Sequence, residues 1–286
     1  MALSNSARTV WSARILTNTS KVAVAAGICN RDYEADSANA EAVKITSIVD
    51  PTIRSYTGAD ITVEDIDDSQ QSLLLDQKKY FAFYLDDVER AQTFDGGRLM
   101  AEAIDRAAYG LANTMDALVL DKMVSGVSFS NPDNNIEEIT VSTAAGAYDH
   151  LVDLSVLLDS SDVPPEQRWA VVPPQFYGLL LKDSRFVSAG DAAGAATRAN
   201  GRVGEAAGMA IYKSNNLPTA ASGTSATNKF CIAGSTYATT LAEQVRSLRS
   251  DPVEKKFAEQ VKGLHVYGVK VTRPSFLAVS DVRITA

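Results

Sequence analysis

Few side chains in this sequence could carry out acid-base or nucleophilic chemistry. The chain contains 2 histidines, His150 and His265, and 2 cysteines, Cys29 and Cys231. Histidine is the usual general acid or base near neutral pH, and a cysteine thiolate can be a nucleophile or a metal ligand. The cysteines form no CxxC pair and stand far apart, which is typical of a reducing compartment and gives no metal framework. We therefore expect the cysteines to be small core residues and the histidines to have structural or exposed positions.

The common catalytic motifs are missing from the sequence. It contains no HExxH, GxSxG, Walker A or EF-hand pattern, so metal, acyl-transfer and nucleotide mechanisms lack their residues. The glycine-rich piece GRVGEAAG (201–208) fits no phosphate-binding fingerprint and indicates a loop. Acid pairs such as Asp67 with Asp68 could serve acid-base catalysis, but an extended polar setting favours a solvated face. We expect no enzyme activity, no cofactor and no metal.

The composition is that of a folded protein. Hydrophobic residues make up 45% and charged residues 22% of the 286 residues, which excludes a disordered chain and allows one or two domains. The net charge of −8 opposes general coating of nucleic acid. The longest apolar stretch, VAVAAGIC (22–29), is shorter than the roughly 20 residues that a membrane span needs. No charged leader precedes an apolar run at the amino terminus, so we expect no secretory signal and synthesis in the cytoplasm.

The first part of the chain is basic. Residues 1–31 contain no acid and four cations, and a group of acids follows directly. The cations are Arg8, Arg14, Lys21 and Arg31. Two interpretations stay open: an ordinary flexible terminus, or an arm that docks on a partner chain or faces an anionic surface.

Residues 41–88 are predicted to form a long two-stranded ribbon. The segment 43–56 is rich in β-branched residues, and the return segment LLLDQKKYFAFYLDD (73–87) alternates strictly at its centre. Phe81 and Phe83 lie on one face of the return segment, and Tyr80 and Tyr84 lie on the other. Sixteen extended residues span about 50 Å. Because both faces are apolar or aromatic, the ribbon needs cover, and its reach favours neighbouring subunits.

The period becomes helical after residue 89. Apolar residues recur at spacings of three and four over 94–125, with Asp95 as a plausible N-cap and Gly126 as a plausible stop. Asp116 is one of the polar residues between them. A helix of some 30 residues would be about 45 Å long.

The rest of the chain alternates short strands with separate helices. We expect strands near 136–143, 169–172, 211–218 and from 230, helices at 148–160 and after Pro173, and one long strand near the end, over 263–284. This order indicates an α+β fold and not a regular series of βαβ units.

Several stretches resemble recurring phrases of one protein family. They are YTGADITVEDIDDSQQSLLLDQKKYFAFYLDDVERAQ, PPEQRWAVVPPQFYGLLLKDSRF, IYKSNNLP and EKKFAEQVKGLHVYGVKVTRPSFLAVSDV. In this order, and over roughly residues 30–285, the chain resembles the major capsid proteins of tailed bacteriophages, which have the Hong Kong 97-type shell fold. The resemblance implies six parts: an N-terminal arm (1–40), an extended loop (41–88), a peripheral domain with a spine helix (89–143), an axial domain (144–250), a return strand of the peripheral domain (251–273) and a C-terminal segment (274–286).

The resemblance also implies partners and contacts. The chain would assemble with itself into hexamers and pentamers of an icosahedral head, through Tyr80, Phe81, Phe83 and Tyr84 of the extended loop and through the basic residues of the arm. A portal, a separate scaffolding protein, a possible decoration protein and packaged double-stranded DNA, bound without sequence specificity, would complete a virion capsid assembled in the host cytoplasm. No membrane is implied, and no motif identifies a covalent crosslink.

Two alternatives remain at this point. An encapsulin-like compartment would keep the fold and store a cargo protein. A soluble enzyme with an unrecognised site would be a compact monomer or small oligomer.

Overall fold

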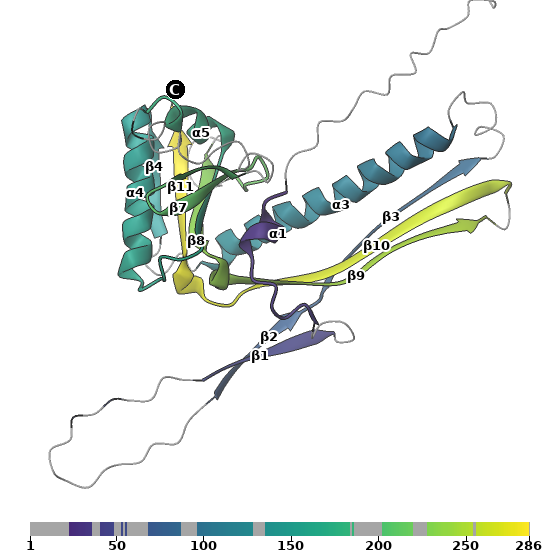
Figure 1. The fold of residues 1–286 in the computed structure, drawn as a ribbon, viewed down its shortest axis with the longest axis horizontal. Helices are drawn as coiled ribbons and strands as arrows, with labels where there is room; N and C mark the ends of the chain where they lie inside the picture. Colours follow the sequence, from purple (N-terminus) through teal and green to yellow (C-terminus); the bar gives the residue numbers. More distant parts are fainter. Residues whose placement is uncertain are drawn as a thin grey trace, which may run out of the picture.

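A long helix runs beside a three-stranded sheet, and a six-stranded sheet with two helices stands at one end of both (Figure 1). The structure, a computed structural model, describes residues 23–35, 41–48, 53, 55, 68–86, 96–127, 135–183, 185, 202–219, 228–253 and 256–285. The mixture of helices and sheets confirms the predicted α+β class.

The long helix is α3 (Gly96–Gly126), as the periodicity predicted. Its core-facing side chains lie in the C-terminal half, where Met115, Val119, Leu120 and Met123 are buried. Ala108, which the apolar pattern also included, is exposed. The C-terminal half of α3 is therefore packed in the core, and the rest of the helix lies along the three-stranded sheet.

The three-stranded sheet has the order β3-β10-β9 and is antiparallel throughout. Its strands are β3 (Gln77–Asp86), β9 (Thr239–Pro252) and β10 (Ala258–Val271). Strand β9 was not predicted. The long terminal strand that we expected is two strands, because a 3₁₀ turn at Pro274–Phe276 separates β10 from β11 (Leu277–Ile284). Proline lacks the N–H that a continuous strand would need.

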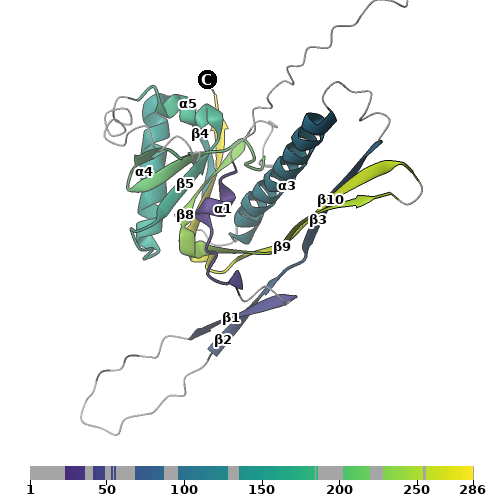
Figure 2. The same ribbon diagram turned by 45° about the vertical axis from the view of Figure 1, so that its right-hand side comes forward.

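The ribbon predicted for 41–88 is wrong in its pairing. Strand β1 (Ala42–Ile48) pairs with β2 (Asp68–Leu74), and β3 pairs with β10 instead of continuing the hairpin. The break follows Leu74, where the Leu75 N–H donates to the Glu41 carbonyl over 3.0 Å and ends the hairpin. Only β1 and β2 therefore form the projecting hairpin that Figure 2 shows below the three-stranded sheet.

A small apolar cluster attaches this hairpin to the body of the subunit. Val43, Ile45 and Leu73 are buried against Ala242 of β9 and Val266 of β10. Burial of apolar surface at about 25 cal/mol per Å² is the main term that holds the hairpin there.

The six-stranded sheet has the order β4-β11-β8-β5-β7-β6. Besides β11, its strands are β4 (Asn135–Val141), β5 (Arg168–Val172), β6 (Arg202–Ala206), β7 (Met209–Lys213) and β8 (Lys229–Ser235). Strand β5 is buried on both faces, with Trp169 and Val171 in one apolar cluster and Ala170 and Val172 in the other. Helices cover both sides: α3 and the short α1 (Ala25–Ile28) contribute to the first cluster, and α4 (Ala144–Ser160) and α5 (Pro174–Leu180) contribute to the second.

Helix α4 (Ala144–Ser160) begins four residues earlier than predicted because Thr143 caps it, its hydroxyl accepting from the Gly146 N–H over 3.1 Å. Helix α5 (Pro174–Leu180) has its proline in the first turn, as expected.

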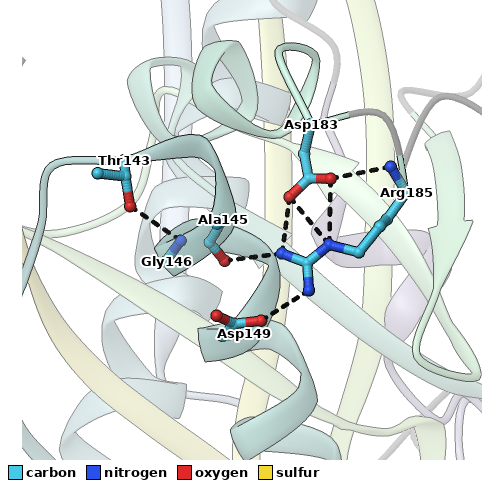
Figure 3. Close-up of polar contacts among 6 residues, drawn as sticks. All are labelled: Thr143, Ala145, Gly146, Asp149, Asp183 and Arg185. Atoms are coloured by element: carbon cyan, nitrogen blue, oxygen red, sulfur yellow. Dashed lines mark hydrogen bonds and ion pairs between the residues drawn. The ribbon is translucent and has the colours of Figure 1, made fainter.

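A polar cluster ties the start of α4 to the segment after α5 (Figure 3). The Arg185 guanidinium donates to Asp149 Oδ1 at 2.9 Å, to the Ala145 carbonyl at 3.2 Å and to Asp183 Oδ2 at 2.8 Å. It also lies 4.5 Å from the centre of the Tyr148 ring. Hydrogen bonds from Arg185 hold the pKa of Asp183 below its ordinary value. The cluster fastens α4 to α5, and we see no reaction that it could carry out.

His150 is buried between α4 and the six-stranded sheet. Its Nε2 lies 2.8 Å from Ser280 Oγ, its ring meets Phe176 edge-on with centroids 6.0 Å apart, and its Nδ1 has no hydrogen-bond partner among the described residues. Burial lowers the pKa of His150 from 6.5 to about 4, with Asp153 opposing part of the shift. The imidazole is therefore neutral in the folded subunit at neutral pH.

This neutral histidine predicts a loss of stability on acidification. The unfolded chain binds a proton at His150 below about pH 6.5, and the folded chain does so only near pH 4, so stability is full above pH 6.5 and falls between these values. The shift corresponds to about 3 kcal/mol. In urea unfolding of the unassembled subunit at a series of pH values, His150→Gln should show a shallower loss between pH 6.5 and 4. Equal losses in variant and wild type would contradict the prediction, because carboxylates titrate alike in both.

Candidate assembly surface

The outer face of the three-stranded sheet carries an exposed aromatic strip. Tyr80 and Tyr84 on β3 are 77% and 59% exposed, and Leu264, the cross-strand partner of Tyr80 on β10, is 39% exposed. We call these three residues the outer strip. Phe257 is 86% exposed and lies just before β10, at the end of the sheet where Tyr84 lies. Exposed apolar side chains that gather in this way mark surfaces that another molecule covers.

The other two aromatic residues of the predicted contact lie on the inner face. Phe81 and Phe83 are half-buried, with ring centroids 6.0 Å apart. Phe81 pairs with Gly263 across the strands, and a Cβ at Gly263 would collide with the Phe81 ring. The Phe81 ring thus covers Gly263 of its own subunit. Gly263 lies on the same face of β10 as Tyr267, and Tyr267 packs with α3.

The four predicted contact residues therefore separate into two pairs. Tyr80 and Tyr84 are free to meet another molecule, and Phe81 and Phe83 contribute to the fold of the subunit. All four lie on β3 and not on the β1–β2 hairpin. The alternation of the sequence predicted the two faces, but it could not indicate which face α3 covers.

Of the basic residues predicted for the arm, the structure describes only Arg31; Arg8, Arg14 and Lys21 lie outside the described residues. The Arg31 guanidinium donates to Glu34 at 2.8 Å and to Glu243 of β9 at 3.0 Å. Glu243 is buried and also lies 3.1 Å from Nε2 of the buried His265. Arg31 therefore has intrachain partners, and a contact of Arg31 with another chain stays a prediction.

Sequence reasoning missed Asp116, which is fully buried on α3 although it stands among the polar residues between the apolar positions. The signal was present, because Asp116 precedes Val119 and Leu120 by three and four residues and so shares their face of the helix. Its carboxylate accepts the backbone N–H groups of Val24 and Ala25 over 2.7 and 2.8 Å.

The two cysteines are buried in the core, as expected from the sequence. Burial, with a smaller contribution from Asp116, raises the pKa of the Cys29 thiol to about 12, and burial also raises the pKa of Cys231. Within the described part of the chain, no group of three His, Cys, Asp or Glu side chains could hold a metal ion. None of the helices described here is long and apolar enough to cross a membrane.

Comparison with known proteins decides the family. A family model described as phage capsid protein matches residues 68–280, well over half of the chain. The chain belongs to the phage capsid protein family. It is a major capsid protein that forms the icosahedral shell of a tailed phage, and its role is structural and not enzymatic. No curated protein matches the sequence.

Solved structures resemble this phage capsid protein over nearly its whole length. That of Mycobacterium phage Che8 is 26% identical, covers 98% of both chains and has a TM-score of 0.78. The capsid structure of the cyanophage P-SCSP1u is 16% identical, covers 96% of this chain and 92% of its own, and has a TM-score of 0.74. The capsid of Ralstonia phage GP4, at 12% identity, covers 100% and 98% with a TM-score of 0.74. The Hong Kong 97-like capsid fold expected from the sequence is confirmed.

Proposed function

We propose that this capsid protein assembles into pentamers and hexamers that enclose double-stranded DNA, with the outer strip as one of the contacts between copies. The observation that carries the proposal is the exposure of Tyr80, Tyr84 and Leu264 on one sheet face, beyond the part of that face that the β1–β2 hairpin covers. Rings of five or six identical subunits need a contact between two different surfaces of the chain. The outer strip supplies one of these surfaces, and a different surface of the adjacent copy supplies the other.

The division into six parts belongs to the same proposal, with two changes that the strand pairing supports. Residues 77–86 pair with β10, so they group with the peripheral domain and not with the extended loop. Residues 239–252 also pair with β10 and leave the axial domain for the peripheral one. The extended loop is then the β1–β2 hairpin and its tip, and residues 1–40 remain the arm.

The partners form the rest of the proposal. A separate scaffolding protein and a portal act with the chain during assembly in the host cytoplasm, and a decoration protein is an optional further partner. The net charge of −8 supports a container that encloses DNA without coating it or reading its sequence.

Electron cryomicroscopy of particles purified from the phage host tests this function. We expect an icosahedral shell with five-fold and six-fold capsomers whose double-stranded DNA resists added nuclease. Shells that hold a bound cargo protein and no DNA would favour an encapsulin-like compartment instead. Capsomers in which Tyr80 and Tyr84 face solvent in every copy would overturn the contact while leaving the shell intact.

A further inference from the structure

A buried carboxylate joins three separate parts of the subunit. Asp116 Oδ1 accepts from the Val24 and Ala25 N–H groups, and Asp116 Oδ2 accepts from Asn216 Nδ2 over 2.8 Å. Asn216 follows β7 of the six-stranded sheet and also donates to Asn113 on α3 over 2.9 Å. One side chain of α3 therefore holds both the segment 23–35, which we call the anchor segment, and a loop of the six-stranded sheet.

This carboxylate is costly to bury. Asp116 is 0% exposed and lies among Met115, Val119 and Leu120, and the three donors that bind it are neutral amides. A buried charge without a cationic partner pays a desolvation penalty that an apolar side chain would avoid. Stability alone does not account for its presence, whereas a need to fix the position of the bonded backbone does.

The anchor segment is fixed at a second point nearer its end. Asn30 exchanges backbone hydrogen bonds with β9, its N–H donating to Thr239 and its carbonyl accepting from Leu241, each over 2.9 Å. Arg31 then binds the buried Glu243. In Figure 2, α1 lies between the C-terminal half of α3 and the strands of both sheets. Asp116 is thus the fixed point nearest to residues 1–22, since its bonded residues, Val24 and Ala25, lie two and three positions after residue 22.

We propose that Asp116 is a positioning residue for assembly: it fixes where the N-terminal arm leaves the subunit and so where the arm meets a neighbouring copy. The inference rests on the proposed function, because it treats the part of the arm before the anchor segment, residues 1–22, as a segment that contacts another chain. Asp116 acts through the backbone of Val24 and Ala25 and touches no neighbouring subunit itself. Its effect on shells should therefore exceed its effect on folding.

The test compares Asp116→Ala with three other variants. Asn216→Ala removes the bond to the six-stranded sheet and keeps the bonds to the anchor segment. Asp116→Asn keeps an oxygen for Val24 and Ala25, removes the charge, and puts a donor where Asp116 Oδ2 accepts from Asn216, so it also loses the bond that Asn216→Ala removes. Leu154→Ala creates a cavity in the other apolar cluster and is the control for general destabilisation.

Two readouts separate positioning from folding. Limited trypsin digestion of unassembled subunits measures how often the anchor segment opens, through the rate of cleavage after Arg31. Without the carboxylate this rate should rise by about tenfold or more, because proteolysis follows the open population. Electron microscopy then gives the yield and diameter of the shells.

We expect Asp116→Ala to be cleaved quickly and to form few or misshapen shells, while Asn216→Ala, Asp116→Asn and Leu154→Ala stay near the wild type in both readouts. Wild-type cleavage in Asp116→Ala would overturn the proposal, and so would equal loss of shells in Leu154→Ala. If Asp116→Ala does not fold, the result for Asp116→Asn decides whether the proposal stands. Fast cleavage or a loss of shells in this folded variant would show that an oxygen bonded to Val24 and Ala25 is not enough to position the arm. The digestion needs no shell, so its result does not depend on whether the wild-type chain assembles as proposed.

Discussion

Replacing Tyr80 and Tyr84 together by serine should abolish shell formation and leave the subunit folded. Both side chains are more than half exposed, and Lys256 lies over the Tyr84 ring, with its Nζ 4.9 Å from the ring centre. Exposed substitutions of this kind change the free energy of unfolding by within about 0.5 kcal/mol. Central aromatic residues of an interface are worth about 2 kcal/mol or more each, and every copy in the shell would lose two.

Analytical ultracentrifugation of the purified variant measures shell formation, and thermal unfolding measures the stability of the subunit. The matched control is Tyr237→Ser combined with Val156→Ser, since these residues are 43% and 55% exposed and lie away from the outer strip. Shells of normal yield from the tyrosine pair would remove the outer strip from the assembly contacts. Equal loss in the control would show that any two exposed apolar residues matter as much.

Adding one methyl group at Gly268 should detach the β1–β2 hairpin. A Cβ at this position would lie 2.9 Å from the Leu74 carbonyl carbon and 3.1 Å from the Leu75 Cα, and closer still to the Leu74 oxygen. These are backbone atoms, so no side chain can rotate away. The chain between β2 and β3 must move off β10 and open the apolar cluster beneath the hairpin. Overpacking of this kind costs about 1–3 kcal/mol.

Hydrogen exchange should report the detachment in Gly268→Ala as faster exchange of the amides of β1 and β2, with α4 and α5 unchanged. Gly110→Ala on α3 is the control, because nothing lies within 4 Å of a Cβ there. That change should raise the stability of the subunit, since alanine is favoured over glycine in a helix by about 1 kcal/mol. Uniform exchange across Gly268→Ala, equal to that of the wild type, would show that the backbone tolerates the methyl group.

Local patterns in the sequence predicted the elements whose residues carry their own signal. The limits of α3 followed from the apolar period and from Gly126, and the alternation of Tyr80, Phe81, Phe83 and Tyr84 indicated a strand with two distinct faces. These signals are local because helix and strand periods involve residues a few positions apart.

The pairing of strands was not local, and the sequence analysis failed there. Residues of β3 pair with β10 far along the chain, as Phe81 does with Gly263. Neither segment has a sequence pattern that identifies the strand with which it pairs. The hairpin and β3 appeared as one ribbon because their residues are similar in type on both sides of Leu75. The inner position of Phe81 depends on that pairing, so the candidate contact could be predicted only as four residues and not as the two that remain exposed.

Strand β10 connects the packed core of the subunit to the outer strip. Its Val269 and Val271 pack in the main core cluster, while the outer strip lies several residues toward the other end. The Tyr84 end of the strip, opposite Gln260, lies about ten residues or about 33 Å from these valines, so a rotation of about 5° at the packed end would displace Tyr84 by about 3 Å. The register of β10 with β9 shifts between Val266 and Tyr267, which lie between the packed valines and the outer strip. Such irregularities increase the local twist of the strands. The twist at this one point therefore sets the angle at which each subunit presents its aromatic strip.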